Sequence, residues 1–166
     1  MELLSATPVS PAPSSADADL LREQLQRFVR SFGLLVTRQT PCGQPVSPSY
    51  AHALMVLLER DIAGAPTTQT DLGAALGIDK SNVARLCSRL EDAGHAEQSP
   101  APDDARIRLV SLTARGKRMA ERITEASRDR FARITAALPR SERASVLDSL
   151  ALLNDAVETL REDSKP

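Results

Sequence analysis

Apolar residues recur at helical spacing near both ends of the chain. In the N-terminal part they step by four and three along one face, at Leu21, Leu25, Phe28, Phe32 and Leu35, with Leu20, Val29 and Val36 widening the stripe. The same stepping returns near the C-terminus at Val146, Leu150, Leu153, Val157 and Leu160. Such seams, with little domain left to cover them, predict helices that pack against a second copy of the chain.

Between these seams, turn and capping residues mark the limits of further helices. Ser47 before Pro48 is a good helix start, and Gly64 with Pro66 is a stop, so a helix is predicted from Pro48 to Ile62. The positions of this helix that we expect to face inward are Ala51, Leu54, Met55 and Leu58. Residues 40–45, rich in proline and glycine, predict a loop before it.

Two short helices joined by a glycine turn are predicted next. Thr68 and Asp71 form a capping box for a helix over residues 69–76, and Gly77 follows it directly. Asp79 is placed to cap a helix from Lys80 to about Ala93, which Gly94 closes. This arrangement is a helix-turn-helix.

A hairpin and two further helices complete the expected elements. Residues 95–99 and 108–112 can be extended, and the turn-rich residues 100–105 lie between them, which predicts a β-hairpin wing. Thr113 is expected to cap a long helix that Pro139 interrupts, and Ser141 to cap the last helix.

The predicted fold is mainly α with a small β-hairpin wing: a winged helix-turn-helix domain plus a helical dimerisation domain. Residues 1–16, with three prolines among small residues, are expected to form a flexible tail. Residues 17–63 supply N-terminal helices for dimerisation and scaffold, residues 64–113 the DNA-binding domain, and residues 114–162 the C-terminal dimerisation helices.

Composition narrows the possible functions. The chain of 166 residues is 42% hydrophobic and 26% charged, as expected for a globular protein, and its 2% aromatic content argues against a base-stacking surface for single strands. The net charge is −1, so any nucleic-acid footprint has to be local. The N-terminus lacks the pattern of a secretory signal, and no segment has the about 18 apolar residues of a membrane span, so we expect a cytoplasmic protein with no membrane partner.

Such a local charge lies on the second helix of the helix-turn-helix. Val83, Leu86, Cys87 and Leu90 form its apolar face, which must dock on the domain. The opposite face mixes cations with an amide and hydroxyls, groups that can contact phosphates and base edges in a major groove. It comprises Lys80, Ser81, Asn82, Arg85, Ser88 and Arg89.

Residues 67–118 resemble the MarR family (multiple antibiotic resistance regulators). The helix-turn-helix residues that carry the resemblance are Leu72, Leu76, Gly77, Lys80, Ser81, Val83, Arg85, Leu86, Arg89, Leu90, Glu91 and Gly94. The wing carries the family's signature, Asp104-Ala105-Arg106, five residues, then Leu112-Thr113, and Gly116 follows at the start of the long helix. His95 to Gln98 depart from the bulkier, more basic residues often seen there.

The resemblance implies a triangular homodimer that binds a pseudo-palindromic double-stranded operator. Members commonly repress and are released by a small molecule or by cysteine oxidation; the oxidation-sensing subgroup carries its cysteine in the first helix, where this chain has none. An effector pocket would lie where the helical and DNA-binding parts meet. The candidates are Phe28, Phe32, Tyr50 and His52, for which ordinary core packing is the alternative.

Further DNA contacts are expected at the first short helix and at the wing. Arg106 at the wing tip is placed to enter a minor groove, with Asp104 orienting it as an ion pair. Arg108 is directed either to phosphate or to solvent. Thr68, Gln69 and Thr70 begin a helix whose N–H groups favour a phosphate, although capping alone explains them equally well.

Other chemistry is sparse. Cys87 is expected to be a buried apolar residue, whereas Cys42 lies in a loop without a nearby cation to lower its pKa. Two histidines and two separated cysteines offer no metal site, and no cofactor is expected. We find no phosphate loop or nucleophile elbow, so an enzyme is not expected. The main alternative to DNA binding is a winged-helix module that binds another protein.

Overall fold

The computed structural model describes residues 14–35 and 38–163. Contacts divide the chain into two compact units, Met1–Pro48 and Ser49–Pro166, and each unit is described by itself. Most of the expected tail, residues 1–13, and Val36 of the first apolar stripe lie outside the described residues. The mainly helical fold class with one small hairpin is confirmed.

The first unit contains one helix, α1 (Ser15–Phe32), among its described residues. Ser14 and Asp17 form a capping box, so the helix begins earlier than the expected residue 17 and takes in Ser15 and Ala16 from the predicted tail. It ends before Leu35 because Gly33 adopts a left-handed conformation with φ 86°. The predicted loop at residues 40–45 contains no helix or strand.

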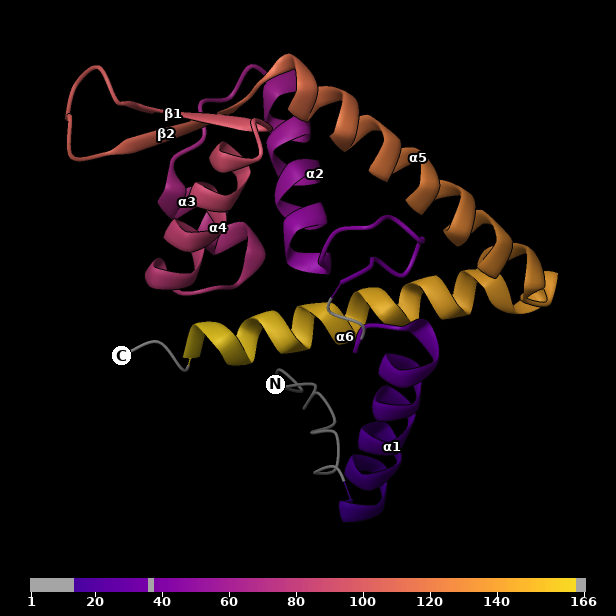
Figure 1. Ribbon diagram of the computed structural model, residues 1–166. Helices are drawn as coiled ribbons and strands as arrows, with labels where there is room; N and C mark the ends of the chain where they lie inside the picture. Colours follow the sequence, from indigo (N-terminus) through magenta and orange to yellow (C-terminus); the bar gives the residue numbers. More distant parts are fainter. Residues whose placement is uncertain (1–13, 36–37, 164–166) are drawn as a thin grey trace, which may run out of the picture. The chain divides into compact units, whose positions relative to one another are not determined.

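The second unit holds the helix-turn-helix. Helix α2 spans Pro48–Ile62, α3 spans Gln69–Leu76 and α4 spans Lys80–Asp92, with bounds at or within one residue of those predicted. Helices α3 and α4 lie side by side, and the hairpin packs beside α4 (Figure 1). A methyl group added at Gly73 would lie 3.3 Å from Ile78 O and from Val83 Cγ1, so this glycine permits the close approach of α3 and α4.

The wing is an antiparallel hairpin of β1 (Ala96–Pro100) and β2 (Arg108–Leu112), in which Ala96 pairs with Leu112. Strand β2 also pairs with the chain before α3, through an antiparallel bridge between Thr68 and Leu109. The Val110 N–H donates to the Thr67 carbonyl at 2.8 Å in the same place. The wing root is therefore bonded on both edges of β2.

Helix α5 (Ala114–Ala137) joins the wing through Thr113. The Thr113 hydroxyl accepts from the Gly116 N–H at 3.0 Å and donates to the Gly94 carbonyl at 2.8 Å, while the Thr113 N–H donates to the His95 carbonyl at 3.1 Å. The His95 carbonyl lies so close to Gly116 that a Cβ there would be 1.8 Å from its oxygen. The cap predicted at Thr113 is confirmed.

The start of the last helix was predicted wrongly. Pro139 begins a short 3-10 turn, Arg140–Glu142, and α6 spans Arg143–Asp163. Ser141 lies inside that turn and donates to the Glu142 carboxylate at 3.2 Å instead of capping α6. A 3-10 turn takes up the residues after a proline that the capping rule assigned to an N-cap.

The core of the second unit lies between α2, the helix-turn-helix, the wing root and the start of α5. Its fully buried larger side chains are Leu54, Leu72, Leu90, Ile123 and Cys87, so the buried position expected for Cys87 is confirmed. On α2 the inward face differs from the prediction: Ala53 and Leu57 are buried, whereas Met55 and Leu58 are only half-buried. The buried face of α2 is therefore centred on Ala53, Leu54 and Leu57.

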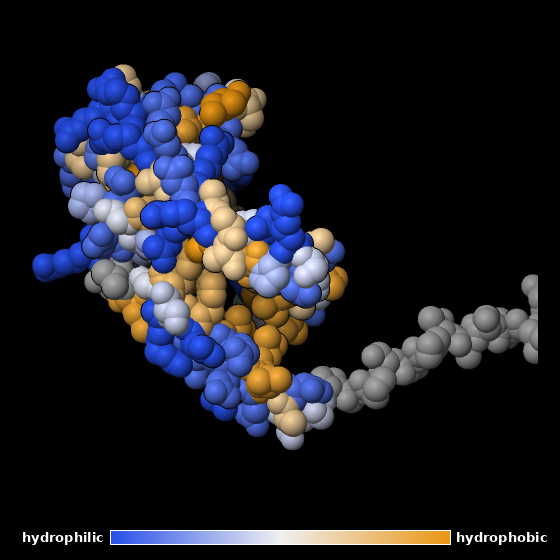
Figure 2. Space-filling view, turned by 90° about the vertical axis from the view of Figure 1, so that its right-hand side faces the viewer, coloured by the Kyte–Doolittle hydropathy of each residue, from blue (hydrophilic) through white to orange (hydrophobic). Residues whose placement is uncertain are grey.

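Large apolar side chains remain exposed along α1, the second half of α5, and α6. Leu152 of α6 is 70% exposed, Phe28 of α1 is 52% and Phe131 of α5 is 51% exposed. Hydrophobic surface among hydrophilic groups is visible in the space-filling view (Figure 2). In the described residues, no helix is both long and apolar enough for a membrane crossing.

Candidate nucleic-acid interface

Helix α4 presents the predicted polar face to solvent. Val83, Leu86, Cys87 and Leu90 are buried, as the spacing predicted. The six residues proposed to contact DNA are all exposed: Lys80, Ser81, Asn82, Arg85, Ser88 and Arg89. The face therefore offers three cations, one amide and two hydroxyls to an outside partner.

Asp79 organises the N-terminus of this face. Its carboxylate accepts from the Ser81 hydroxyl at 2.7 Å, the Asn82 N–H at 2.9 Å and the Asn82 side-chain amide at 2.5 Å. The Ser81 hydroxyl and the Asn82 N–H stabilise the anion and lower the pKa of Asp79 to about 2. Two of the proposed DNA-contacting side chains are thus fixed in place by the residue that caps the helix.

The two arginines of α4 are held differently. The Arg85 Nε donates to the Ser81 carbonyl at 3.3 Å and its terminal nitrogen to the Ser81 hydroxyl at 3.3 Å, so Arg85 folds along its own helix. The Arg89 guanidinium instead lies over the Tyr50 ring, 5.6 Å from the ring centre. Tyr50 belongs to α2, and the sequence pattern did not link it to the recognition helix.

Burial and a hydrogen bond to His95 hold Tyr50 in place. Its side chain is 5% exposed, and its hydroxyl lies 2.7 Å from Nδ1 of His95, at the junction of α4 and the wing. Burial raises the pKa of Tyr50, and the nearby Arg89 and Arg115 charges oppose that rise. Burial lowers the pKa of His95, and Arg115 and Arg122 lower it further. Both shifts favour the neutral forms of the phenol and the imidazole, which share this hydrogen bond.

The start of α3 is occupied by internal contacts. The Thr68 hydroxyl donates to the Asp71 carboxylate at 2.7 Å and accepts from the Asp71 N–H, which confirms the capping box. The Gln69 amide donates to the Gln98 side chain, which in turn donates to Glu91 at 2.6 Å. Sequence reasoning missed this chain of three side chains, since they come from α3, β1 and α4. Thr70 is exposed beside them.

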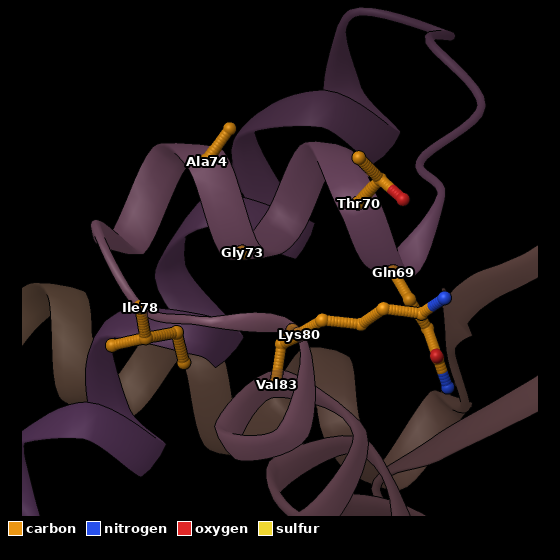
Figure 3. Close-up of a pocket in the computed structure, with 7 residues that line it drawn as sticks. All are labelled: Gln69, Thr70, Gly73, Ala74, Ile78, Lys80 and Val83. Carbon is orange, nitrogen blue, oxygen red and sulfur yellow. The ribbon is translucent and has the colours of Figure 1, made fainter. Parts of the chain in front are cut away.

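A cavity of about 260 Å³ opens between α3 and the start of α4 (Figure 3). Ala74, Ile78 and Val83 give it an apolar lining, and Gln69, Thr70 and Lys80 give it polar edges. The Lys80 side chain extends toward Gln69 across the opening. The cavity lies between α3 and α4, the two helices that carry predicted DNA contacts. Its polar edges, Gln69, Thr70 and Lys80, are themselves among those predicted contacts.

The wing carries two further cations. Asp104 accepts from the Arg106 N–H at 2.9 Å and from its Nε at 3.2 Å, so the expected ion pair is present. The Arg106 side chain is 93% exposed, which leaves the rest of its guanidinium open to a partner. Arg108 is exposed where β2 begins, opposite Pro100.

The four candidates for an effector pocket divide between the two units. Phe28 and Phe32 stack on each other with ring centres 5.1 Å apart. Tyr50 and His52 are two residues apart on α2 and lie on different faces, since Tyr50 is buried and His52 exposed. Core packing, the alternative role for the four candidates, therefore applies to Tyr50 and not to His52. Cys42 is half-buried, with its Sγ 3.0 Å from the Thr40 hydroxyl.

Comparison with known proteins points to one family. The sequence model of the MarR family matches residues 45–107. The uncharacterized HTH-type transcriptional regulator YdgJ of Bacillus subtilis (strain 168) is 28% identical over 116 residues, 69% of this chain and 68% of YdgJ.

Two solved structures share the fold over most of both chains. The crystal structure of a probable transcriptional regulator from Pseudomonas aeruginosa is 27% identical, with a TM-score of 0.63, and the match covers 84% of this chain and 97% of that one. The PcaV transcriptional regulator from Streptomyces coelicolor, solved with its natural ligand, is 25% identical, with a TM-score of 0.61 and coverage of 90% and 99%.

Proposed function

We propose that this chain, which is similar to MarR-family transcriptional regulators, is a repressor that binds a pseudo-palindromic double-stranded operator as a homodimer. The observation that carries the proposal is the exposed polar face of α4, which presents Lys80, Arg85 and Arg89, together with the exposed Arg106 of the wing. Because the net charge of the whole chain is −1, attraction to DNA has to come from a local concentration of cations such as this one.

In this proposal α4 enters a major groove and reads base edges. Asn82 supplies the amide that pairs with adenine, and Arg85 and Arg89 supply the fork that pairs with guanine or phosphate. Arg106, oriented by Asp104, enters the neighbouring minor groove. Ser81, Ser88, Thr70 and Arg108 supply further hydrogen bonds to the backbone, whereas Thr68 and Gln69 act through their contacts with Asp71 and Gln98.

The homodimer is supported by the exposed apolar residues of α1 and α6. Leu21 and Phe28 on α1, and Leu150 and Val157 on α6, follow the spacing of a helical seam and are 40% or more exposed. Burying such surfaces between two copies stabilises an assembly by about 25 cal/mol per Å² of apolar area. Two recognition helices then meet successive major grooves about 34 Å apart.

Release by a small molecule completes the proposal. PcaV was solved with its natural ligand, which supports a ligand-bound state in this fold. Phe28 and Phe32 offer stacked rings to an aromatic or apolar effector. A coupling of about 1–3 kcal/mol between effector and operator changes operator affinity by about 5- to 150-fold.

The test is binding of the purified protein to the DNA upstream of its own gene, against a scrambled duplex, across a range of salt concentrations. We expect saturable preference for the upstream duplex and a steep salt dependence. Arg106→Ala should lower the slope of log affinity against log salt by about one. Arg128→Ala, which removes an exposed charge from α5, is the matched control and should leave the slope unchanged.

A protein-interaction module gives a different result. A folded dimer that shows the same weak, salt-sensitive affinity for both duplexes, with Arg106→Ala no different from Arg128→Ala, contradicts the proposal.

A further inference from the structure

Arg89 is held by a residue outside the recognition helix. Its guanidinium carbon lies 5.6 Å from the centre of the Tyr50 ring, within the range of a cation–π interaction. Arg85, one turn earlier on the same helix, bonds to Ser81 of its own helix. The two arginines that face DNA are thus positioned by different parts of the fold.

The Tyr50 ring has little freedom of its own. It is 5% exposed, its hydroxyl lies 2.7 Å from Nδ1 of His95, and the two rings meet edge to face with centres 5.9 Å apart. His95 is fixed in turn, since its N–H donates to the Leu90 carbonyl at 2.9 Å and its carbonyl accepts from the Thr113 N–H. A rigid ring beneath a long side chain limits the rotamers that the side chain can adopt.

We propose that Tyr50, held by His95, is a positioning residue that presents the Arg89 guanidinium to DNA. This inference rests on the proposed function, because it assumes that Arg89 contacts the operator. Arginine loses rotamer freedom when it binds, so an arginine already restrained on a ring binds with a smaller entropy cost. Tyr50 therefore contributes to operator affinity without touching DNA.

A direct measurement in solution uses the fact that Tyr50 is the chain's one tyrosine. Protein labelled with 3-fluorotyrosine gives a single fluorine resonance, which reports the surroundings of this ring. We expect Arg89→Gln to move the resonance and Arg85→Gln, the matched control on the same helix, to leave it in place. A resonance that does not move in Arg89→Gln overturns the proposal.

The functional test is a double-mutant cycle on binding to the upstream duplex. Arg89→Gln should weaken binding about 5- to 100-fold, as loss of a good base or phosphate contact does. Tyr50→Leu should weaken binding about 3- to 10-fold in the wild type, in line with a cation–π contact, and should have no further effect once Arg89 is Gln. With Arg85→Gln the effect of Tyr50→Leu should persist in full.

Each failure has its own signature. If Arg89→Gln binds like the wild type, Arg89 is not a DNA contact, and that part of the proposed function fails together with the positioning role. If Arg89→Gln weakens binding but Tyr50→Leu weakens it equally in both backgrounds, Tyr50 is a packing residue only and the proposal is overturned. If Tyr50→Leu does not fold, Tyr50→Phe replaces it: loss of the hydroxyl frees the ring from His95, and the expected loss of about twofold must again vanish in Arg89→Gln.

Discussion

Gly116 makes a sharp test of how the wing is joined to α5. A methyl group at this position would lie 1.8 Å from the His95 carbonyl oxygen and 2.8 Å from its carbon. Both are backbone atoms of a residue that is bonded on either side to Leu90 and Thr113, so no rotamer change relieves the overlap. Gly116→Ala therefore forces α5 away from the wing root.

The cost follows from the contacts that such a movement breaks. Overpacking costs about 1–3 kcal/mol, and backbone overlap belongs at the upper end of that range. Loss of the Thr113 bonds to the carbonyls of Gly94 and His95 costs about 1 kcal/mol more, while alanine in a helix returns about 1 kcal/mol. The net destabilisation is about 3 kcal/mol, or about 6–12 °C in Tm for a chain of this size.

Urea unfolding followed by circular dichroism, together with a thermal melt, measures this effect. The control is Ala132→Gly at an exposed position of α5, where helix propensity alone costs about 1 kcal/mol. If Gly116→Ala is as stable as the wild type or more so, the close approach of α5 to His95 does not exist in solution and the reasoning fails.

Two other groups give predictions from their titration. Asp79→Ala should lower Tm at neutral pH because α4 loses its cap. Folding lowers the pKa of Asp79 from 3.8 to about 2. The difference in Tm should therefore be present above about pH 4 and vanish as the pH falls toward about 2. A difference that persists at about pH 2 would show that the carboxylate charge is not its cause. Burial, with a smaller effect of Glu91, raises the pKa of the Cys87 thiol to about 11; iodoacetamide should therefore label Cys42 alone in the folded protein and Cys87 only in urea, as mass spectrometry will report. Equal labelling of both cysteines without urea would contradict the buried position.

Capping residues made much of the fold predictable. Thr68 with Asp71, Asp79, and Thr113 each place a hydroxyl or carboxylate at the first turn of a helix, and all three caps are present. Local chemistry of this kind needs no knowledge of tertiary contacts. It misled at Ser141, because the backbone after Pro139 closes a 3-10 turn before α6 begins.

Contacts between segments that are distant in the sequence could not be predicted from local patterns. The apolar spacing on α4 predicted which side of the helix is exposed, but nothing local indicated that Arg89 would lie on Tyr50, or that Tyr50 would bond to His95, 45 residues away. Gln69 and Gln98 likewise meet only because the chain before α3 runs along β2. The apolar stripe of α1 could be predicted from its spacing, and Leu21 and Phe28 on it are exposed within the described residues.

The joint at Thr113 gives α5 the properties of a mechanical lever. The helix has 24 residues and is continuous from the wing root to Ala137, which makes it a rod about 36 Å long. The carbonyls of Gly94 and His95 both accept hydrogen bonds from Thr113, the N-cap of this helix. If such a rod turns by about 5° about its end at Ala137, its other end, at the wing root, moves by about 3 Å. This distance is comparable to the spacing between adjacent base pairs. In the proposed DNA complex, a small angular change at the far end of α5 would therefore move the wing along the DNA.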